Sequence, residues 1–127
     1  MLPRRTVLLH LRVVWELIRY DALFACLGFR GVRPKGGGPV TLGGRPDQET
    51  AICQAICTVT PFYWKPIRCL QRSIITARIM RSEGIPAEVV IGYRPMPFFG
   101  HAWVEVNGRV ANDSPTYKKQ LQILERL

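Results

Sequence analysis

The chain has 127 residues, a length that fits one domain built around a single hydrophobic core. Hydrophobic residues make up 47% of the chain and charged residues 21%, and this balance excludes a wholly disordered protein. The 18 lysine and arginine residues outnumber the 9 acidic residues, which gives a formal charge of +9. Such a surface favours anionic partners, which include nucleic acid, acidic membranes and acidic peptides.

The start of the chain does not resemble a secretory leader, because charged residues such as Arg12, Glu16 and Arg19 interrupt its apolar stretch. No uncharged run approaches the roughly 20 residues that a membrane-spanning helix needs. We therefore expect a cytoplasmic protein, without a role at a membrane, whose cysteines are reduced thiols. These cysteines are Cys26, Cys53, Cys57 and Cys69.

Residues 6–27 are predicted to form a helix, because apolar side chains recur there at helical spacing. These are Leu8, Leu11, Trp15, Ile18 and Ala22. The simplest interpretation is a face that packs against the core. The alternative is a surface helix that docks a membrane or a partner protein, which the basic residues on another side of the helix would favour.

Residues 28–46 are rich in glycine and proline and are predicted to be a loop, with a linker favoured over a lid. The glycines do not fit a phosphate-binding pattern, since no Lys-Ser or Lys-Thr pair follows them. Asp47 is expected to cap a helix that runs to about Thr60. Cys53 and Cys57 share one face of that helix, where buried apolar packing is favoured over metal binding.

The remainder of the chain is predicted to form one more helix and a small sheet. The helix begins at Cys69, after an aromatic segment at residues 62–68, and ends before Gly84. Strands are predicted at residues 88–93, 101–106 and 109–113, with an open loop at 94–100 and a short helix at 116–127. Helices followed by an antiparallel sheet indicate an α+β fold.

Three residues form a candidate catalytic set. Cys69 lies at a helix start, where the helix dipole and the free amides favour a thiolate, although this placement alone also suits a buried structural cysteine. His101 begins a strand directly after a loop, where an imidazole can reach a cleft. With Asp113 further along the chain, they fit the roles of nucleophile, general base and orienting carboxylate.

The register of the last hairpin decides whether two of these residues can meet. A two-residue turn at residues 107–108 would send Asp113 to the face opposite His101. A three-residue turn shifts the register by one and places the two side chains directly opposite each other, about 5 Å apart at Cβ. That register also pairs Glu105 with Arg109, so we favour it. An equivalent slip farther along the strands would have the same effect.

Three blocks of sequence carry a resemblance to a known family. They begin at Cys69, Arg81 and His101 and read CLQRSIITAR, RSEGIPAEVVIGY and HAWVEVNGRVANDSP. Over residues 62–115 the chain is similar to the transglutaminase-like cysteine peptidases that act as leader peptidases in lasso peptide biosynthesis. The family's cysteine, histidine and aspartate fall on Cys69, His101 and Asp113.

The resemblance implies a transglutaminase-like or papain-like α+β core at residues 62–127. An N-terminal helical part at residues 1–61 would pack on its small antiparallel sheet to complete one compact domain. It also implies a peptidase that cuts the leader from a ribosomally made precursor peptide, with no cofactor and no metal. A separate leader-recognition protein would present the precursor, since residues 1–68 do not suggest the winged-helix-like recognition domain of some members. A separate ATP-dependent cyclase would then close the ring.

Four aromatic residues near the expected catalytic residues are candidates for the wall of the substrate groove, with core packing as the alternative. They are Trp64, Phe98, Phe99 and Trp103.

Other functions are weighed against this one. The same triad could transfer its acyl group to an amine, as in transamidation, instead of to water. Nucleic-acid binding is not expected, because the basic residues are dispersed and no recognition motif is visible. A structural zinc site would have poor ligand spacing. Its ligands would be Cys53, Cys57, Cys69 and His101.

Overall fold

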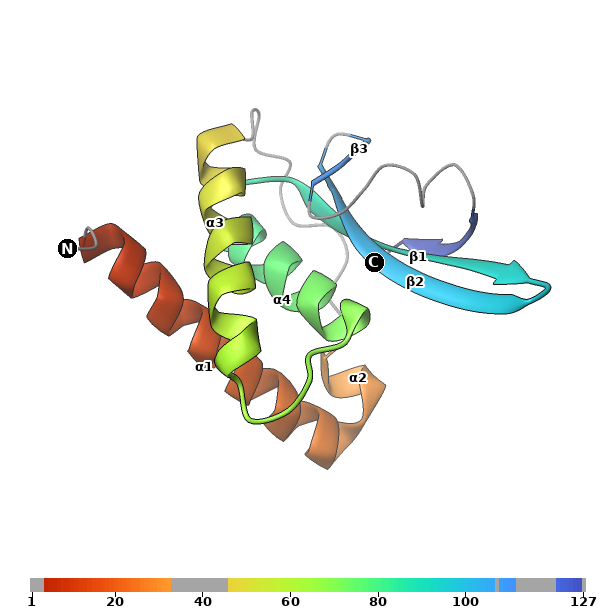
Figure 1. Cartoon of the computed structure of the whole chain (residues 1–127), viewed down its shortest axis with the longest axis horizontal. Helices are drawn as coiled ribbons and strands as arrows, with labels where there is room; N and C mark the ends of the chain where they lie inside the picture. Colours follow the sequence, from red (N-terminus) through yellow and green to blue (C-terminus); the bar gives the residue numbers. More distant parts are fainter. Residues whose placement is uncertain (1–3, 33–45, 107, 112–120, 127) are drawn as a thin grey trace.

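The computed structural model describes residues 4–32, 46–106, 108–111 and 121–126. Its elements follow the chain as α1 (Arg4–Leu27), α2 (Phe29–Val32), α3 (Pro46–Val59), the 3-10 turn η1 (Thr60–Phe62), α4 (Cys69–Ser82), β1 (Ala87–Pro95), β2 (Phe98–Val106), β3 (Arg109–Val110) and β4 (Gln122–Arg126). The strands form one antiparallel sheet in the order β3-β2-β1-β4 (Figure 1). The predicted α+β fold is confirmed.

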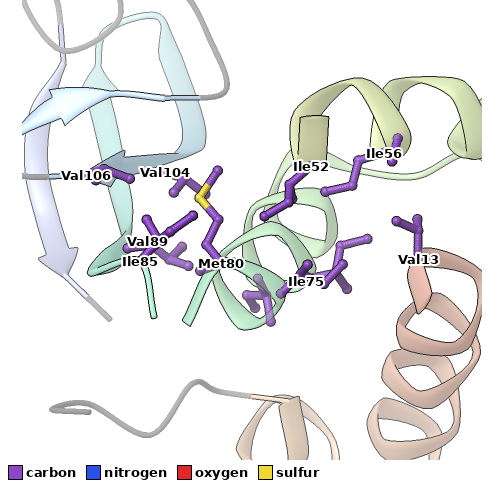
Figure 2. Close-up of a cluster of buried hydrophobic side chains, with 14 of the residues drawn as sticks. Val13, Ile52, Ile56, Ile75, Met80, Ile85, Val89, Val104 and Val106 are labelled. Atoms are coloured by element: carbon purple, nitrogen blue, oxygen red, sulfur yellow. The ribbon is translucent and has the colours of Figure 1, made fainter. Parts of the chain in front are cut away.

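Helix α4 occupies the centre of the molecule. It packs against α1 and α3 on one side and against β1 and β2 on the other (Figure 1). In Figure 2, Met80 extends toward Val89 and Val104 of the sheet, whereas Ile75 lies toward Val13 of α1. One cluster of buried side chains therefore joins the N-terminal helices to the sheet through α4.

The end of α4 is fixed by Gly84, as the sequence predicts. Gly84 has a positive φ of 82°, which a residue without a Cβ adopts at little cost. Its amide donates to the carbonyl of Arg81 (3.1 Å), and the amide of Ile85 donates to the carbonyl of Met80 (2.9 Å). These two bonds form a Schellman motif that turns the chain toward β1.

The sequence prediction selected the wrong face of α1 for the core. Leu11 and Trp15 are each 60% exposed, whereas Val13 and Leu17 are fully buried. Both sets have helical spacing, so periodicity cannot choose between them. The buried face also carries Glu16, whose carboxylate pairs with Arg78 of α4. This ion pair forms together with the packing of Val13 and Leu17 in the core.

Two further sequence predictions in the N-terminal half, the loop at 28–46 and the cap at Asp47, differ from the structure. A short helix, α2, lies within the predicted loop, of which residues 33–45 fall outside the described part of the chain. Helix α3 begins at Pro46, so Asp47 lies in its first turn and does not precede it as a cap. Proline suits the first helical position, because it lacks only an amide that would be unpaired there.

The predicted open loop at 94–100 is a tight hairpin. The β1–β2 ladder continues to the pair Pro95 and Phe98, and the peptide bond between Met96 and Pro97 is cis. Continued pairing satisfies backbone groups that an open loop would leave to water.

The predicted C-terminal helix is wrong for residues 122–126, which form β4. This strand pairs with the free edge of β1, so that Val90 faces Arg126 and Gly92 faces Ile123. Leu121 precedes the strand and is buried. Edge pairing and this burial together override the local helical pattern.

Candidate active site

Cys69 is the first residue of α4, as predicted. The preceding residue, Arg68, is extended (φ −80°, ψ 161°), and no side chain caps the helix. The Cys69 thiol is half-buried. The first-turn amides therefore have no capping side chain as acceptor and can stabilise a thiolate or an oxyanion.

A carboxylate of α1 holds the segment that leads into α4. Asp21 accepts hydrogen bonds from the Tyr63 hydroxyl and from Nε2 of Gln71 (3.2 Å), and it pairs with Nζ of Lys65 (2.6 Å). Burial, followed by the hydrogen bond to Asp21, raises the pKa of Tyr63. Gln71 lies two residues after Cys69 and is itself buried, so Asp21 positions the start of α4.

His101 lies in a row of stacked rings on β2. Its ring centroid is 6.2 Å from that of Phe99 and 6.1 Å from that of Trp103, with interplanar angles of 20° and 27°. The residue paired with His101 on β1 is Gly92, whose lack of a side chain makes room for the Trp103 ring on this face of the sheet.

Trp103 belongs to a second, smaller buried cluster with Val90 and Leu121. It is 1% exposed, and its Nε1 donates to Oε2 of Glu105 (2.9 Å). Nη1 of Arg126 on β4 donates to the other oxygen of Glu105 (3.2 Å). The structure thus places Trp103 in the core and not at an open groove.

His101 and the core-facing residues of β2 lie on different faces of the sheet. Val104 packs with Val89 in the cluster that α4 completes, and Trp103 packs on the opposite side. Because side chains alternate along a strand, His101 shares the face of Trp103.

The favoured hairpin register is wrong where the structure describes it. Val106 pairs with Arg109, which is the two-residue turn, and Gly108 has a φ of 81°. Asp113 lies outside the described residues, so its contact with His101 stays a prediction. This contact now depends on the other possibility named in the sequence analysis, which is a change of register after Ala111.

The other aromatic candidates differ in exposure. Trp64 and Phe98 are each 78% exposed, and Phe99 is half-buried. A hollow of about 410 Å³ lies beside Trp64, immediately before α4. Its lining residues are Thr60, Pro61, Tyr63, Trp64, Lys65, Pro66, Ile67 and Arg72.

The remaining cysteines are separate from this region. Cys53 packs against the core and donates to the carbonyl of Ala111 (3.7 Å), and burial, together with Cys57 and Glu49, raises its pKa to about 11. Cys57 is exposed, contrary to the prediction of burial, and Cys26 is exposed as well. In the part of the chain that is described, no three histidine, cysteine or acidic side chains gather as a metal site would require.

Comparison with known proteins gives the family. The family model of the transglutaminase-like superfamily matches residues 14–126, which is most of the chain. This chain belongs to the transglutaminase-like superfamily. Both the resemblance seen in the three sequence blocks and the expected transglutaminase-like fold are confirmed.

Among curated proteins, this transglutaminase-like chain is similar to the Microcin J25-processing protein McjB of Escherichia coli. The two are 42% identical over 59 residues, which are 46% of this chain and 28% of that protein. The similarity therefore spans less than a third of the relative's length. No solved structure matches the chain. None of the helices in the described ranges is long and apolar enough to cross a membrane.

Proposed function

We propose that this chain is a cysteine peptidase that removes the leader from a lasso peptide precursor. Its membership of the transglutaminase-like superfamily and its similarity to a protein named for processing microcin J25 support the proposal. The observation that carries it is the position of Cys69 as the uncapped first residue of α4. In this proposal His101 is the general acid and base, and Asp113 orients its ring.

The chemistry follows from these roles. The Cys69 thiolate attacks the carbonyl carbon of the leader–core bond, and the backbone amide of Cys69 donates to the oxyanion that forms. Protonated His101 then gives its proton to the core amine as the carbon–nitrogen bond breaks, leaving a thioester on the leader. A water molecule, deprotonated by His101, hydrolyses the thioester, which releases the leader carboxylate and restores the thiol.

This mechanism requires the His101 ring to come within hydrogen-bonding reach of the Cys69 sulfur. In the structure the ring lies on the face of β2 away from the α4 core. The proposal therefore includes a movement of the His101 side chain or of the β1–β2 hairpin when peptide binds. It also includes a register change beyond Ala111 that brings Asp113 to His101.

The proposed partners are a precursor peptide, a separate leader-recognition protein and a lasso cyclase. The similarity to the Microcin J25-processing protein supports the precursor peptide as a partner, and it covers 28% of that protein. We propose that the leader-recognition protein holds the leader while this chain cuts it, and that the cyclase then uses the new amine of the core.

The experiment is incubation of the chain with a lasso precursor peptide, with and without a leader-recognition protein, followed by mass spectrometry. The expected products are a leader and a core whose summed mass exceeds that of the precursor by one water. Cys69→Ala and His101→Ala abolish them, and Cys57→Ser, which changes an exposed thiol on α3, does not. Processing by Cys69→Ala at the wild-type rate would refute the proposal, and a product without the added water indicates transamidation.

A further inference from the structure

The hollow before α4 has a composition that suits a ligand. Its wall combines apolar surface from Trp64, Pro66 and Ile67 with two cationic side chains, Lys65 and Arg72. No acidic residue lines it. Few polar groups set in an apolar wall are typical of sites that recognise one chemical group.

Arg72 is the cation in this hollow that lacks a counter-charge within the described chain. Lys65 is paired with Asp21, and its Nζ also lies 5.7 Å from the Trp64 ring centroid. In contrast, Nε of Arg72 is buried and has no hydrogen-bond partner among the described residues. No described acceptor therefore fixes this edge of the guanidinium, and Arg72, which lines the hollow, can turn its guanidinium toward a bound carboxylate.

The hollow is adjacent to the proposed nucleophile. Arg72 follows Cys69 by three residues on α4, and residues at this spacing are neighbours on a helix, about 5–6 Å apart at Cβ. A group bound to the Arg72 guanidinium therefore lies within one or two residues of a peptide bond attacked at Cys69.

We propose that the hollow is a specificity subsite, in which Arg72 binds the carboxylate of an aspartate or glutamate side chain close to the bond that is cut. The guanidinium fork matches a carboxylate geometrically, and Trp64 covers the apolar part of the side chain. The inference rests on the proposed function for the identity of the substrate as a peptide. The presence of a carboxylate site beside Cys69 can be tested without any peptide.

The test compares alkylation of the whole chain by iodoacetate and by iodoacetamide, with each modified cysteine identified by peptide mass spectrometry. In both reactions the thiolate sulfur bonds to the methylene carbon and iodide leaves, but only iodoacetate carries a carboxylate. We expect the ratio of the iodoacetate rate to the iodoacetamide rate to be about fivefold higher at Cys69 than at Cys26 and Cys57. One added charge pair predicts a difference of this size. The chain, with a charge of +9, attracts iodoacetate to all of its thiols. Comparing Cys69 with the exposed thiols removes this general contribution from the measured preference.

Arg72→Gln should reduce the Cys69 preference to that of the exposed thiols, and Arg72→Lys should retain part of it. Arg30→Gln removes the same charge from an exposed position on α2 and should leave the preference unchanged. Circular dichroism establishes that each variant is folded. An unchanged Cys69 preference in folded Arg72→Gln overturns the subsite. Failure of the wild-type chain to cut a precursor instead overturns the proposed function and leaves this result intact.

Discussion

Gly92 is a residue whose lack of a side chain determines the packing around His101. A Cβ at this position would lie 2.7 Å from Cη2 and 2.9 Å from Cζ3 of Trp103, and 3.0 Å from Cβ of Leu121. The indole cannot retreat easily, because its Nε1 is bonded to the buried Glu105. Gly92 thus leaves the space in which Trp103 supports the His101 ring.

We predict that Gly92→Ala lowers the free energy of unfolding by about 1–3 kcal/mol, the usual cost of overpacking a filled site. Urea denaturation followed by circular dichroism measures the change. Gly100→Ala is the matched control on β2, since a Cβ there meets no atom closer than 3.9 Å. Equal stability of the two variants would show that Trp103 is not held as described.

At the residue scale, the sequence predicted what depends on local structure. Cys69 was placed at a helix start because the loop before it and the apolar spacing after it are both local signals. The role of Asp21 was not predictable, because its partners Tyr63 and Gln71 are 42 and 50 residues away in the chain. The role of Arg72 was not predictable either, because only the folded structure shows that its Nε is buried.

At the scale of elements, α1 and α4 are joined through Glu16. Its side chain is 3% exposed and accepts hydrogen bonds from Nε of Arg78 (2.8 Å) and Nε of Arg12 (3.1 Å). Burial alone would raise the pKa of Glu16, but the bonds and charges of Arg78 and then Arg12 outweigh it, so the pKa lies below its ordinary value of 4.5. The carboxylate is therefore the form that stabilises the fold.

We predict that Glu16→Gln destabilises the fold by about 1–3 kcal/mol near neutral pH, because two guanidinium groups lose their shared acceptor. A lowered pKa in the folded state contributes stability that is complete above 4.5 and disappears as the pH falls through the folded value. The difference in urea midpoint between wild type and variant should shrink as the pH falls below 4.5. A difference that stays constant over this range would contradict the pairing.

The element scale also separates what local patterns can and cannot predict. The α+β order, α4 and the Gly84 cap follow from spacing and turn residues. The face of α1 could not be chosen, because two apolar stripes run along one helix. The assignment of β4 failed because its strand conformation depends on pairing with β1, some 30 residues earlier in the chain.

At the scale of the whole molecule, one face of α1 is apolar and exposed. Leu8, Leu11, Trp15 and Ile18 are each at least 50% exposed, although the opposite side of the same helix is buried in the core. Contiguous exposed apolar surface of this kind is typical of interaction sites. We propose that the leader-recognition protein contacts this surface.

We predict that Trp15→Glu abolishes the stimulation of precursor cleavage by the leader-recognition protein and leaves the thermal stability of the chain nearly unchanged. An exposed side chain contributes little to folding, whereas a charge in an apolar interface is costly. Leu124→Glu is the control, because it places the same charge at an exposed apolar residue of β4 instead. Full stimulation of Trp15→Glu would remove α1 from the interface.

The central claim is that the Cys69 sulfur and the side chain at position 101 meet. It is tested by His101→Cys in a chain whose exposed cysteines are replaced by Cys26→Ser and Cys57→Ser, since the half-buried Cys53 has a pKa of about 11. A disulfide forms only where two Cα atoms come within about 7 Å. After mild oxidation in the presence of the precursor peptide, the account predicts a bond from Cys69 to the thiol introduced at position 101, and none in the matched variant Phe98→Cys, whose exposed position lies at the end of the β1–β2 hairpin. A bond at position 98, or none at position 101, would contradict the account.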